Sequence, residues 1–329
     1  MTNTEVHLYE AMGERLPDAE VAAAVRTQVG APVDAVRPLA GFVGNQDFLV
    51  TTGRGDFVLK AGDAHAVVSE AWACERVRAV GVPVPEVVAV DADRNTLALP
   101  YLLMRRLPGA PVDDVDDADA ALETAGRWLR AVHEIEVEGY GLLTASGRGG
   151  PGERGGPPAQ VHGRESTWAD VVARPLAELP ALVAEKILDE PLAERVRSAF
   201  AADAGLLAYG TGGGSGRDGD RRGVLLHADL HPRHVFAERG RLTGIIDWGD
   251  ATVGDPAYEF GRYSRAGDAS LALVLRGYQP DRDAEFDRRI VLYRVLWSLY
   301  ALVWEHAAGG DWFAGHVQAV RDGLHALDA

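Results

Sequence analysis

The sequence predicts an α+β fold of two lobes: a β-rich N-terminal lobe with one main helix, and a mostly helical C-terminal lobe. Short apolar runs bounded by turn-forming residues predict strands within 36–60 and 87–104. Between these stretches, apolar residues recur at helical spacing over 64–80. Beyond the turn-forming pair Pro108 and Gly109, helical spacing dominates. These observations divide the chain into lobes at residues 1–107 and 108–329.

The N-terminal lobe is expected to contain further regular elements. An amphipathic pattern predicts a short helix at 17–29, and glycines divide the stretch 36–60 into several strands. The main helix at 64–80 ends before Pro83, because proline lacks the backbone N–H that a helix interior needs. Two more strands are predicted at 87–90 and 97–104.

The C-terminal lobe is expected to be interrupted by two irregular segments, 146–163 and 210–223. Both are dense in glycine, proline, arginine and aspartate. Segments of this composition bury too little apolar surface to fold, so we expect surface insertions without fixed structure. The predicted helices span 118–134, 168–179, 181–202, 256–265 and, in several pieces, 283–327.

The composition is that of an ordinary globular protein, with 47% hydrophobic and 25% charged residues. A net charge of −16 and the lack of a basic stripe argue against a nucleic-acid-binding surface. The same charge fits a cationic small-molecule partner, and equally a surface that is acidic for solubility. The single cysteine, Cys74, excludes a disulfide within the chain and lies in a pattern typical of a buried helix position.

No leader and no membrane span are predicted. The first sixteen residues carry three glutamates and lack an apolar run followed by a cleavage site. The longest apolar stretch, 295–304, is about half as long as a bilayer span requires. We therefore expect a cytoplasmic protein, a monomer or dimer, without a membrane partner.

Two short motifs carry the strongest functional signal: HADLHPRH at 227–234 and IIDW at 245–248. Pro232 argues against a helix through the first motif, so Asp229 is expected on a loop. Apolar runs on both sides of a turn at Gly240 predict a β-hairpin between the two motifs.

This hairpin would bring His234 and Asp247 to its open end, with Asp229 just outside it. Asp229 could then accept a proton from a hydroxyl group while the other two residues hold a metal–nucleotide complex. Such an arrangement suits Mg²⁺-dependent phosphoryl transfer.

A zinc site of a metallohydrolase is an alternative, because histidines clustered at short spacing bind Zn²⁺. This alternative leaves the apolar strand before Asp247 unexplained. A buried, structural role for the first histidine is the simpler interpretation of that position. The four ligands of the alternative site would be His227, Asp229, His231 and His234.

The motif pair resembles that of the aminoglycoside phosphotransferase family, relatives of the protein kinases in which HGDxxxxN is followed by IDW. Ala228 stands where this family usually has glycine, and His234 where it has a metal-binding asparagine. Macrolide phosphotransferases are similar to this chain in carrying HPxH and then TGxIDW, matched here at 231–234 and 243–248. The resemblance implies a two-lobed protein-kinase-like fold. It also implies transfer of the γ-phosphate of ATP or GTP to a hydroxyl of a small molecule, an antibiotic of the aminoglycoside or macrolide type.

The resemblance further implies the residues that hold the nucleotide. Lys60, at the end of an apolar strand, would pair with the α- and β-phosphates. The glutamate that holds this lysine would be Glu70, whose distance to the segment VPVP matches the family, with Glu75 as the alternative on the same helix. The nucleotide-covering loop would include Gly41, Gly44 and Asn45.

For the transfer itself, the resemblance makes Asp229 the catalytic base and assigns Asp247 and His234 to the metal ion. Mg²⁺ favours oxygen ligands, so an imidazole at this position favours Mn²⁺ or contact through water. In this family the acceptor lies against the C-terminal helices. The acceptor contacts implied in this chain are Asp250, Glu305, Asp311 and Trp312.

Two other functions remain open. A metabolic kinase would act on a small alcohol such as choline, homoserine or a sugar. A nucleotide-binding pseudokinase is suggested by His234, which departs from the family's metal ligand. Hydrolysis of a nucleoside triphosphate that a small molecule stimulates would separate the enzymes from the pseudokinase.

Overall fold

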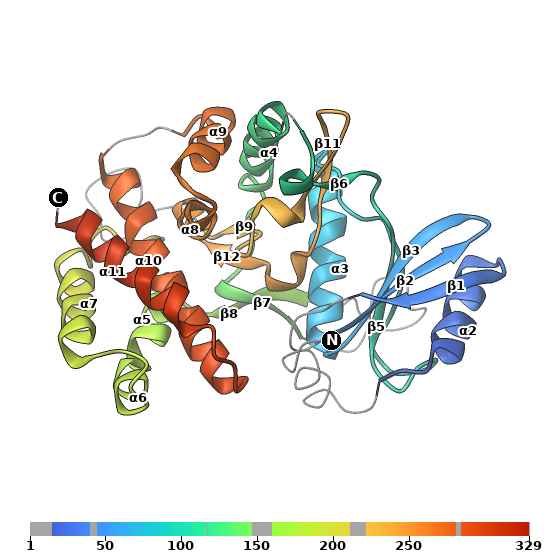
Figure 1. The fold of residues 1–329 in the computed structure, drawn as a ribbon, viewed down its shortest axis with the longest axis horizontal. Coiled ribbons are helices and arrows are strands. Elements are labelled where there is room, and N and C mark those ends of the chain that lie inside the picture. Colours follow the sequence, from blue (N-terminus) through green and yellow to red (C-terminus); the bar gives the residue numbers. More distant parts are fainter. Residues whose placement is uncertain are drawn as a thin grey trace. The chain divides into compact units, whose positions relative to one another are not determined.

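The computed structural model describes residues 15–39, 45–116, 118–146, 160–210, 222–280 and 284–328. The chain forms two compact units, and its elements are labelled in Figure 1. The first unit also takes in residues 243–250, which lie far beyond the first lobe in sequence. The first unit comprises residues 1–110, 144–161 and 243–250, and the second comprises 111–143, 162–242 and 251–329.

The first unit is built on an antiparallel five-stranded sheet of order β1-β2-β3-β5-β4. Every second residue of β2 is buried, as expected for a strand with one face on the core. Helix α2 packs on β1 and β4, and α3 packs on β4 and β5 (Figure 1). The elements are α2 (Asp18–Val29), β1 (Val33–Pro38), β2 (Gln46–Thr52), β3 (Gly55–Ala61), α3 (Ala64–Ala79), β4 (Val87–Asp91) and β5 (Tyr101–Arg105).

Helix α3 begins and ends where the sequence predicts. The carboxylate of Asp63 accepts hydrogen bonds from the backbone N–H groups of His65 and Ala66, which caps the first turn. After the last turn, Gly81 has a φ of 83°, a conformation that glycine adopts without strain. Cys74 is buried on the inner face, and burial raises the pKa of its thiol well above the ordinary value. This cysteine is therefore a packing residue.

The second unit contains most of a four-stranded sheet of order β8-β7-β12-β9 and the remaining helices. A three-stranded sheet of order β11-β10-β6 includes the predicted hairpin, whose turn residues Arg239 and Gly240 both have positive φ. The strands are β6 (Ala110–Pro111), β7 (Tyr140–Ser146), β8 (Gln160–Glu165), β9 (Val224–Leu226), β10 (Val235–Glu238), β11 (Arg241–Ile245) and β12 (Thr252–Gly254). The helices are α4 (Asp119–Val132), α5 (Trp168–Ala177), α6 (Leu179–Ala184), α7 (Glu190–Ala202), α8 (Pro256–Tyr263), α9 (Asp268–Tyr278), α10 (Ala284–Ala307) and α11 (Phe313–Leu327).

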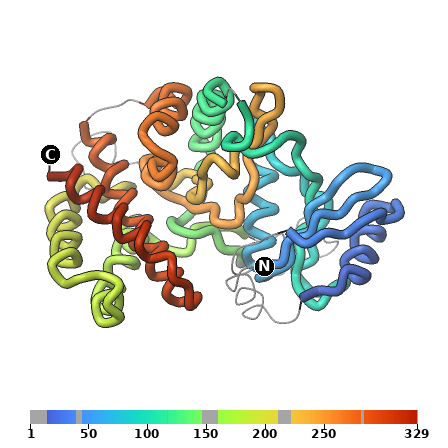
Figure 2. Tube along the Cα trace, viewed as in Figure 1, coloured from blue at the N-terminus to red at the C-terminus, as the bar shows by residue number. Residues whose placement is uncertain are grey.

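Close helix packing organises the core of the second unit. Helices α4 and α9 cross at two glycines: a Cβ at Gly126 would overlap the carbonyl oxygen of Val274, and one at Gly277 that of Glu123. The colour ramp of Figure 2 shows the red helices α10 and α11 on the same side as the yellow-green α5–α7, and α10 contacts α5 while α11 contacts α7. Among the helices in the described ranges, none is both long and apolar enough to span a membrane.

Several predicted elements need correction. The helix expected at 181–202 is interrupted between α6 and α7, because Lys186 adopts a φ of 60° and a new helix begins at Glu190 with Pro191 in its first turn. The strand expected from residue 97 begins only at Tyr101. Helix α9 was not predicted. Residues 160–163, expected in an unstructured insertion, belong to β8, whereas 147–159 and 211–221 of the two insertions lie outside the described residues.

Candidate functional site

Lys60 lies near the end of β3 in the first unit and is 7% exposed. Its ammonium nitrogen lies 2.8 Å from Glu70 Oε2 and 2.5 Å from Asp247 Oδ1. Glu75, the alternative partner, is exposed. The structure thus brings together three residues that the sequence assigned to one site.

Residues 243–250 hold Asp247 in place within the first unit. Ile245 donates its backbone N–H to the carbonyl oxygen of Pro83, and the Thr243 hydroxyl donates to that of Pro108. Asp247 follows with a φ of 65°, a left-handed conformation that aspartate tolerates better than most residues. The short helix η3 (Trp248–Asp250) then packs on α3, the helix that carries Glu70.

A third carboxylate near Lys60, that of Asp47, was not predicted. Asp47 on β2 pairs directly with Lys60 in the strand register, and its Oδ1 is buried without a hydrogen-bond partner. Burial raises the pKa of Asp47 to about 6, although Lys60 opposes the shift. Burial alone would lower the pKa of Lys60, but Glu70, Asp247 and Asp47 together raise it well above its ordinary value.

The donor set around Lys60 fits a divalent cation. Three carboxylates share one ammonium group there, which leaves an excess of negative charge, and burial raises the pKa of Glu70 as well. The side chain of Asp247 is 42% exposed and so remains accessible. Carboxylate oxygens are the ligands that Mg²⁺ prefers. Asp247 therefore suits the predicted metal-binding role.

Asp229 lies in the second unit on a loop after β9, as predicted, and Glu259 of α8 supports this loop. The buried carboxylate of Glu259 accepts hydrogen bonds from the backbone N–H groups of His227, at 2.7 Å, and Ala228, at 3.2 Å. Ala228 has a φ of 65°, which explains why glycine suits this position. The buried His227 accepts a hydrogen bond from the Asp229 N–H at Nδ1, in keeping with a structural role.

The side chain of Asp229 is held by Arg262 of α8, whose Nε donates to Oδ1 at 2.7 Å. His234 contacts the Asp229 carbonyl oxygen through Nδ1 at 3.0 Å, and since a carbonyl oxygen only accepts, Nδ1 is the donor. The ring of His231 lies 3.8 Å from that of His234. Burial, followed by His234 and Arg262, lowers the pKa of His231 to about 3, so this ring is neutral at physiological pH.

Asp229, His231 and His234 can each direct one ligand atom to a common point, with these atoms within 4.8 Å of one another. Two nitrogen donors and one oxygen donor suit Mn²⁺ or Zn²⁺ better than Mg²⁺. His227, the fourth ligand of the alternative zinc site, does not belong to this group.

The predicted acceptor contacts differ in their surroundings. Asp250, Asp311 and Trp312 are exposed, Trp312 to 48%. Glu305 is buried, and its carboxylate accepts the backbone N–H of Trp312 at 3.0 Å, which fixes the turn between α10 and α11. Asn45 is half-buried just before β2, whereas Gly41 and Gly44 of the predicted nucleotide loop lie outside the described residues.

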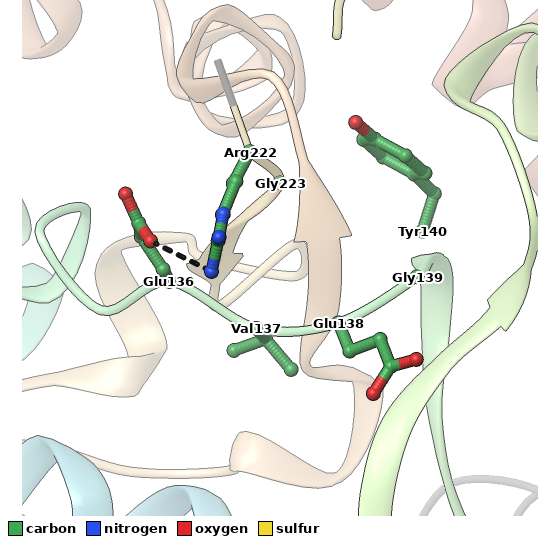
Figure 3. A pocket seen from close by; sticks show the side chains of 7 residues that line it. All are labelled: Glu136, Val137, Glu138, Gly139, Tyr140, Arg222 and Gly223. Atoms are coloured by element: carbon green, nitrogen blue, oxygen red, sulfur yellow. Dashed lines mark ion pairs between the residues drawn. The ribbon is translucent and has the colours of Figure 1, made fainter. Parts of the chain in front are cut away.

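A pocket of the second unit lies apart from these residues (Figure 3). It is lined by residues 136–140 with Arg222 and Gly223, and Arg222 forms an ion pair with Glu136 at 3.6 Å. None of the predicted site residues lines this pocket. The residues around Lys60 and those around Asp229 are therefore the candidate functional sites.

The known proteins that this chain resembles are phosphotransferases. A sequence profile of the phosphotransferase enzyme family matches residues 35–290. Hygromycin-B 4-O-kinase of Escherichia coli is 26% identical over 210 residues, which are 63% of this chain and 54% of that protein. The chain thus matches about half the length of that relative. Homoserine kinase of Gluconacetobacter diazotrophicus is 28% identical over 264 residues, which are 77% of this chain and 68% of that protein.

Solved structures confirm the predicted fold class. A ternary complex of a thermostable mutant of aminoglycoside phosphotransferase APH(4)-Ia with AMP-PNP and hygromycin B has a TM-score of 0.63 at 21% identity, covering 92% of this chain and 98% of that one. The apoenzyme of macrolide 2'-phosphotransferase MphH from Brachybacterium faecium has a TM-score of 0.60 at 19% identity, covering 93% and 97%. At these identities the likeness shows the fold: α+β, with an antiparallel N-terminal sheet and a helical C-terminal part.

Proposed function

Because the chain belongs to the phosphotransferase enzyme family, we propose that it transfers the γ-phosphate of ATP or GTP to a hydroxyl group of a small molecule. The observation that carries the proposal is the buried Lys60 ammonium held between Glu70 and Asp247. A lysine fixed in this way is a point charge ready for the nucleotide phosphates. We propose that residues 1–107 form the nucleotide lobe, and 108–329 the catalytic and acceptor lobe.

In the proposed reaction, the acceptor oxygen forms a bond to the γ-phosphorus while the bond to the β,γ-bridging oxygen breaks. The nucleoside diphosphate leaves, and Asp229 receives the proton of the hydroxyl group. The contact of Arg262 with Oδ1 orients this carboxylate. Lys60 would neutralise the α- and β-phosphates. The loop with Gly41, Gly44 and Asn45 would cover the nucleotide.

A divalent cation, Mg²⁺ or Mn²⁺, would supply positive charge to the phosphate oxygens. We propose Asp247 and His234 as its protein ligands. The excess of carboxylate around Lys60 supports the first, and the place of His234 beside Asp229 and His231, with ligand atoms within 4.8 Å of one another, supports the second. The imidazole favours Mn²⁺ over Mg²⁺.

The acceptor hydroxyl belongs either to an antibiotic or to a metabolite. The match to hygromycin-B 4-O-kinase supports an aminoglycoside-type acceptor and a role in antibiotic resistance. The match to homoserine kinase supports a metabolic acceptor. We propose that the exposed residues Asp250, Asp311 and Trp312 contact the acceptor, and that Glu305 holds the turn that presents Trp312.

A panel of acceptors tests the proposal. The purified chain is incubated with γ-³²P-labelled ATP or GTP, with Mg²⁺ or Mn²⁺, and with aminoglycosides, macrolides, choline, homoserine and sugars in turn. We expect the labelled phosphate of one of the two nucleotides to appear on one class of acceptor. The rate of this transfer should exceed the rate at which labelled phosphate is released when no acceptor is present. If the chain binds nucleotide but transfers phosphate to no acceptor, with either Mg²⁺ or Mn²⁺ present, the result would favour a pseudokinase.

A further inference from the structure

Two arginines, Arg262 and Arg265, lie over the ring of Trp297, and Arg294 is near enough to act on the charge of Arg265. We call Arg262, Arg265 and Arg294 the arginine cluster. The guanidinium carbon of Arg262 lies 4.0 Å from the centroid of the Trp297 ring, and that of Arg265 lies 5.5 Å from it. Arg294 lies on α10, one turn before Trp297, and its positive charge acts on the guanidinium group of Arg265. The cluster lies within the second unit.

The cluster carries more positive charge than its surroundings neutralise. Among the described residues, Asp229 is the one carboxylate that forms an ion pair with it, through Arg262. Arg265 donates to the Ser298 hydroxyl at 3.3 Å, and the buried Nε of Arg294 has no hydrogen-bond partner. Burial, together with Arg262 and Arg294, lowers the pKa of Arg265 to about 10. The positive charge of Arg265 is therefore repelled by both Arg262 and Arg294.

His316 on α11 adds a second polar group without a partner. Its ring lies 5.8 Å from that of Trp297, and its buried Nδ1 has no hydrogen-bond partner. Burial, with Arg265 and Arg262, lowers the pKa of this imidazole to about 4, so it adds no further charge at neutral pH. Unpaired polar groups in a half-buried site cost stability unless a ligand satisfies them.

Packing of the guanidinium groups on the Trp297 ring explains part of this arrangement, since arginine and indole attract each other. It does not explain the charge balance, because a neutral ring leaves three positive charges against one carboxylate. Guanidinium groups match the geometry of carboxylate and phosphate oxygens and form paired, charge-assisted hydrogen bonds with them. An oxyanion would remove the repulsion and give the cluster its missing partner.

We propose that the arginine cluster binds an oxyanion of the acceptor, a carboxylate or phosphate group, on the molecule whose hydroxyl is presented to Asp229. The inference rests on the proposed phosphoryl transfer. The acceptor is the better occupant than the nucleotide because Arg262 touches the carboxylate that receives the acceptor's proton. The phosphates of the nucleotide have a cation of their own in Lys60.

This inference reverses the expectation of a cationic acceptor that the net charge of −16 suggested. The total charge describes the whole surface, whereas the acceptor meets the charges that lie next to Asp229. There, three guanidinium groups stand against one carboxylate that pairs with them. A cationic acceptor would be repelled where its hydroxyl has to react.

Matched pairs of acceptors test the inference on the full chain. Each pair consists of a hydroxylated acid and its amide: L-homoserine, D-glycerate and D-gluconate, with sugar phosphates set against the free sugars. Binding is measured by calorimetry, and transfer by labelled product. We expect at least one acid or phosphate to bind about tenfold or more tightly than its neutral partner.

Substitutions then locate the site. Arg265→Gln and Arg294→Gln should each weaken binding of the anionic member about tenfold and leave the nucleotide affinity unchanged. Arg265→Lys, which keeps the charge, should retain more of the affinity. Arg276→Gln is the control, because Arg276 is an exposed arginine of α9 that pairs with Glu123. Melting temperatures within a few degrees of the wild type show that the variants are folded.

The outcomes separate this inference from the proposed function. Equal binding of acid and amide, or equal affinity in wild type, Arg265→Gln and Arg294→Gln, overturns the oxyanion site. Loss of nucleotide affinity in place of acceptor affinity assigns the cluster to the phosphate donor and also overturns it. Transfer to neutral or cationic acceptors alone overturns the inference and leaves phosphoryl transfer intact. Cluster-dependent anion binding without any transfer supports the oxyanion site and overturns the proposed function.

Discussion

Replacing Glu259 by glutamine should loosen the loop that carries Asp229. The wild-type carboxylate is fully buried and accepts two backbone N–H groups, those of His227 and Ala228. Glutamine keeps the shape of the side chain but turns one acceptor oxygen into an N–H₂ donor, which faces a backbone donor. Because hydrogen bonds to a buried charge contribute about 1.5–3 kcal/mol and an unsatisfied donor costs a similar amount, we expect a loss of about 2–4 kcal/mol.

The loss should be visible in two measurements. A destabilisation of this size lowers the melting temperature by about 3–6 °C in a chain of this length. The turnover number should fall about tenfold to a hundredfold, since a shift of about 1 Å in a catalytic group has effects of that order. Asp189→Ala is a matched control: Asp189 caps α7 by accepting the Leu192 N–H, and its loss should cost about 1 kcal/mol without changing turnover.

The stabilisation by Glu259 should depend on pH in a definite direction. Burial alone would raise the pKa of Glu259, but His133, His227 and the backbone N–H of Ala228 hold it below its ordinary value. The stabilisation is therefore fully present above the unfolded pKa of about 4.3 and is lost as the pH falls through the lower folded pKa. The melting temperatures of wild type and Glu259→Gln should differ most near neutral pH and converge in acid. A difference below 1 °C at pH 7 with unchanged turnover would refute the reasoning.

Three further predictions concern single residues. Burial raises the pKa of Asp47 to about 6, so between about pH 4 and 6 the folded state keeps a proton that the unfolded chain releases, and stability falls as pH rises. Asp47→Asn should thus raise the melting temperature more at pH 7.5 than at pH 5, and an equal change at both would contradict the burial. Ala228→Gly removes a left-handed strain of about 1–2 kcal/mol at an entropic cost of about 0.5–1, so urea denaturation should show a small gain in stability, and a loss would be evidence against the strain. His234→Asn should stay active and shift the ratio of Mg²⁺- to Mn²⁺-supported rates towards Mg²⁺, whereas an unchanged ratio would separate His234 from the metal.

The spacing of apolar residues predicted the helices and strands well where the spacing is regular. The apolar spacing and the proline after α3 placed that helix within a residue of its observed ends, and the apolar runs of β2 and β3 placed both strands. The break between α6 and α7 escaped prediction, because the left-handed conformation of Lys186 leaves no mark in the apolar pattern. Irregular backbone without glycine is set by tertiary packing, which periodicity does not contain.

In the candidate site, too, the sequence motifs predicted some residues, and others became evident only from the tertiary structure. The motif pair and Lys60 could be recognised from a resemblance to a known family, and the structure then distinguished Glu70 from Glu75. Asp47 was missed because its place opposite Lys60 depends on the register of two strands, which neither strand specifies alone. Arg262 was missed because it meets Asp229 across 33 residues of sequence.

The central claim is that Asp229 acts on the acceptor hydroxyl and that the nucleotide is held by other residues. Its most direct test is Asp229→Asn, with phosphoryl transfer measured on the acceptor found in the panel and nucleotide affinity measured by calorimetry. Because the amide cannot take up the proton, we predict that turnover falls by about 10²–10⁴ while the nucleotide dissociation constant stays within a few-fold of wild type. Turnover close to that of the wild type, or a loss of nucleotide affinity that accounts for the whole defect, would contradict the claim.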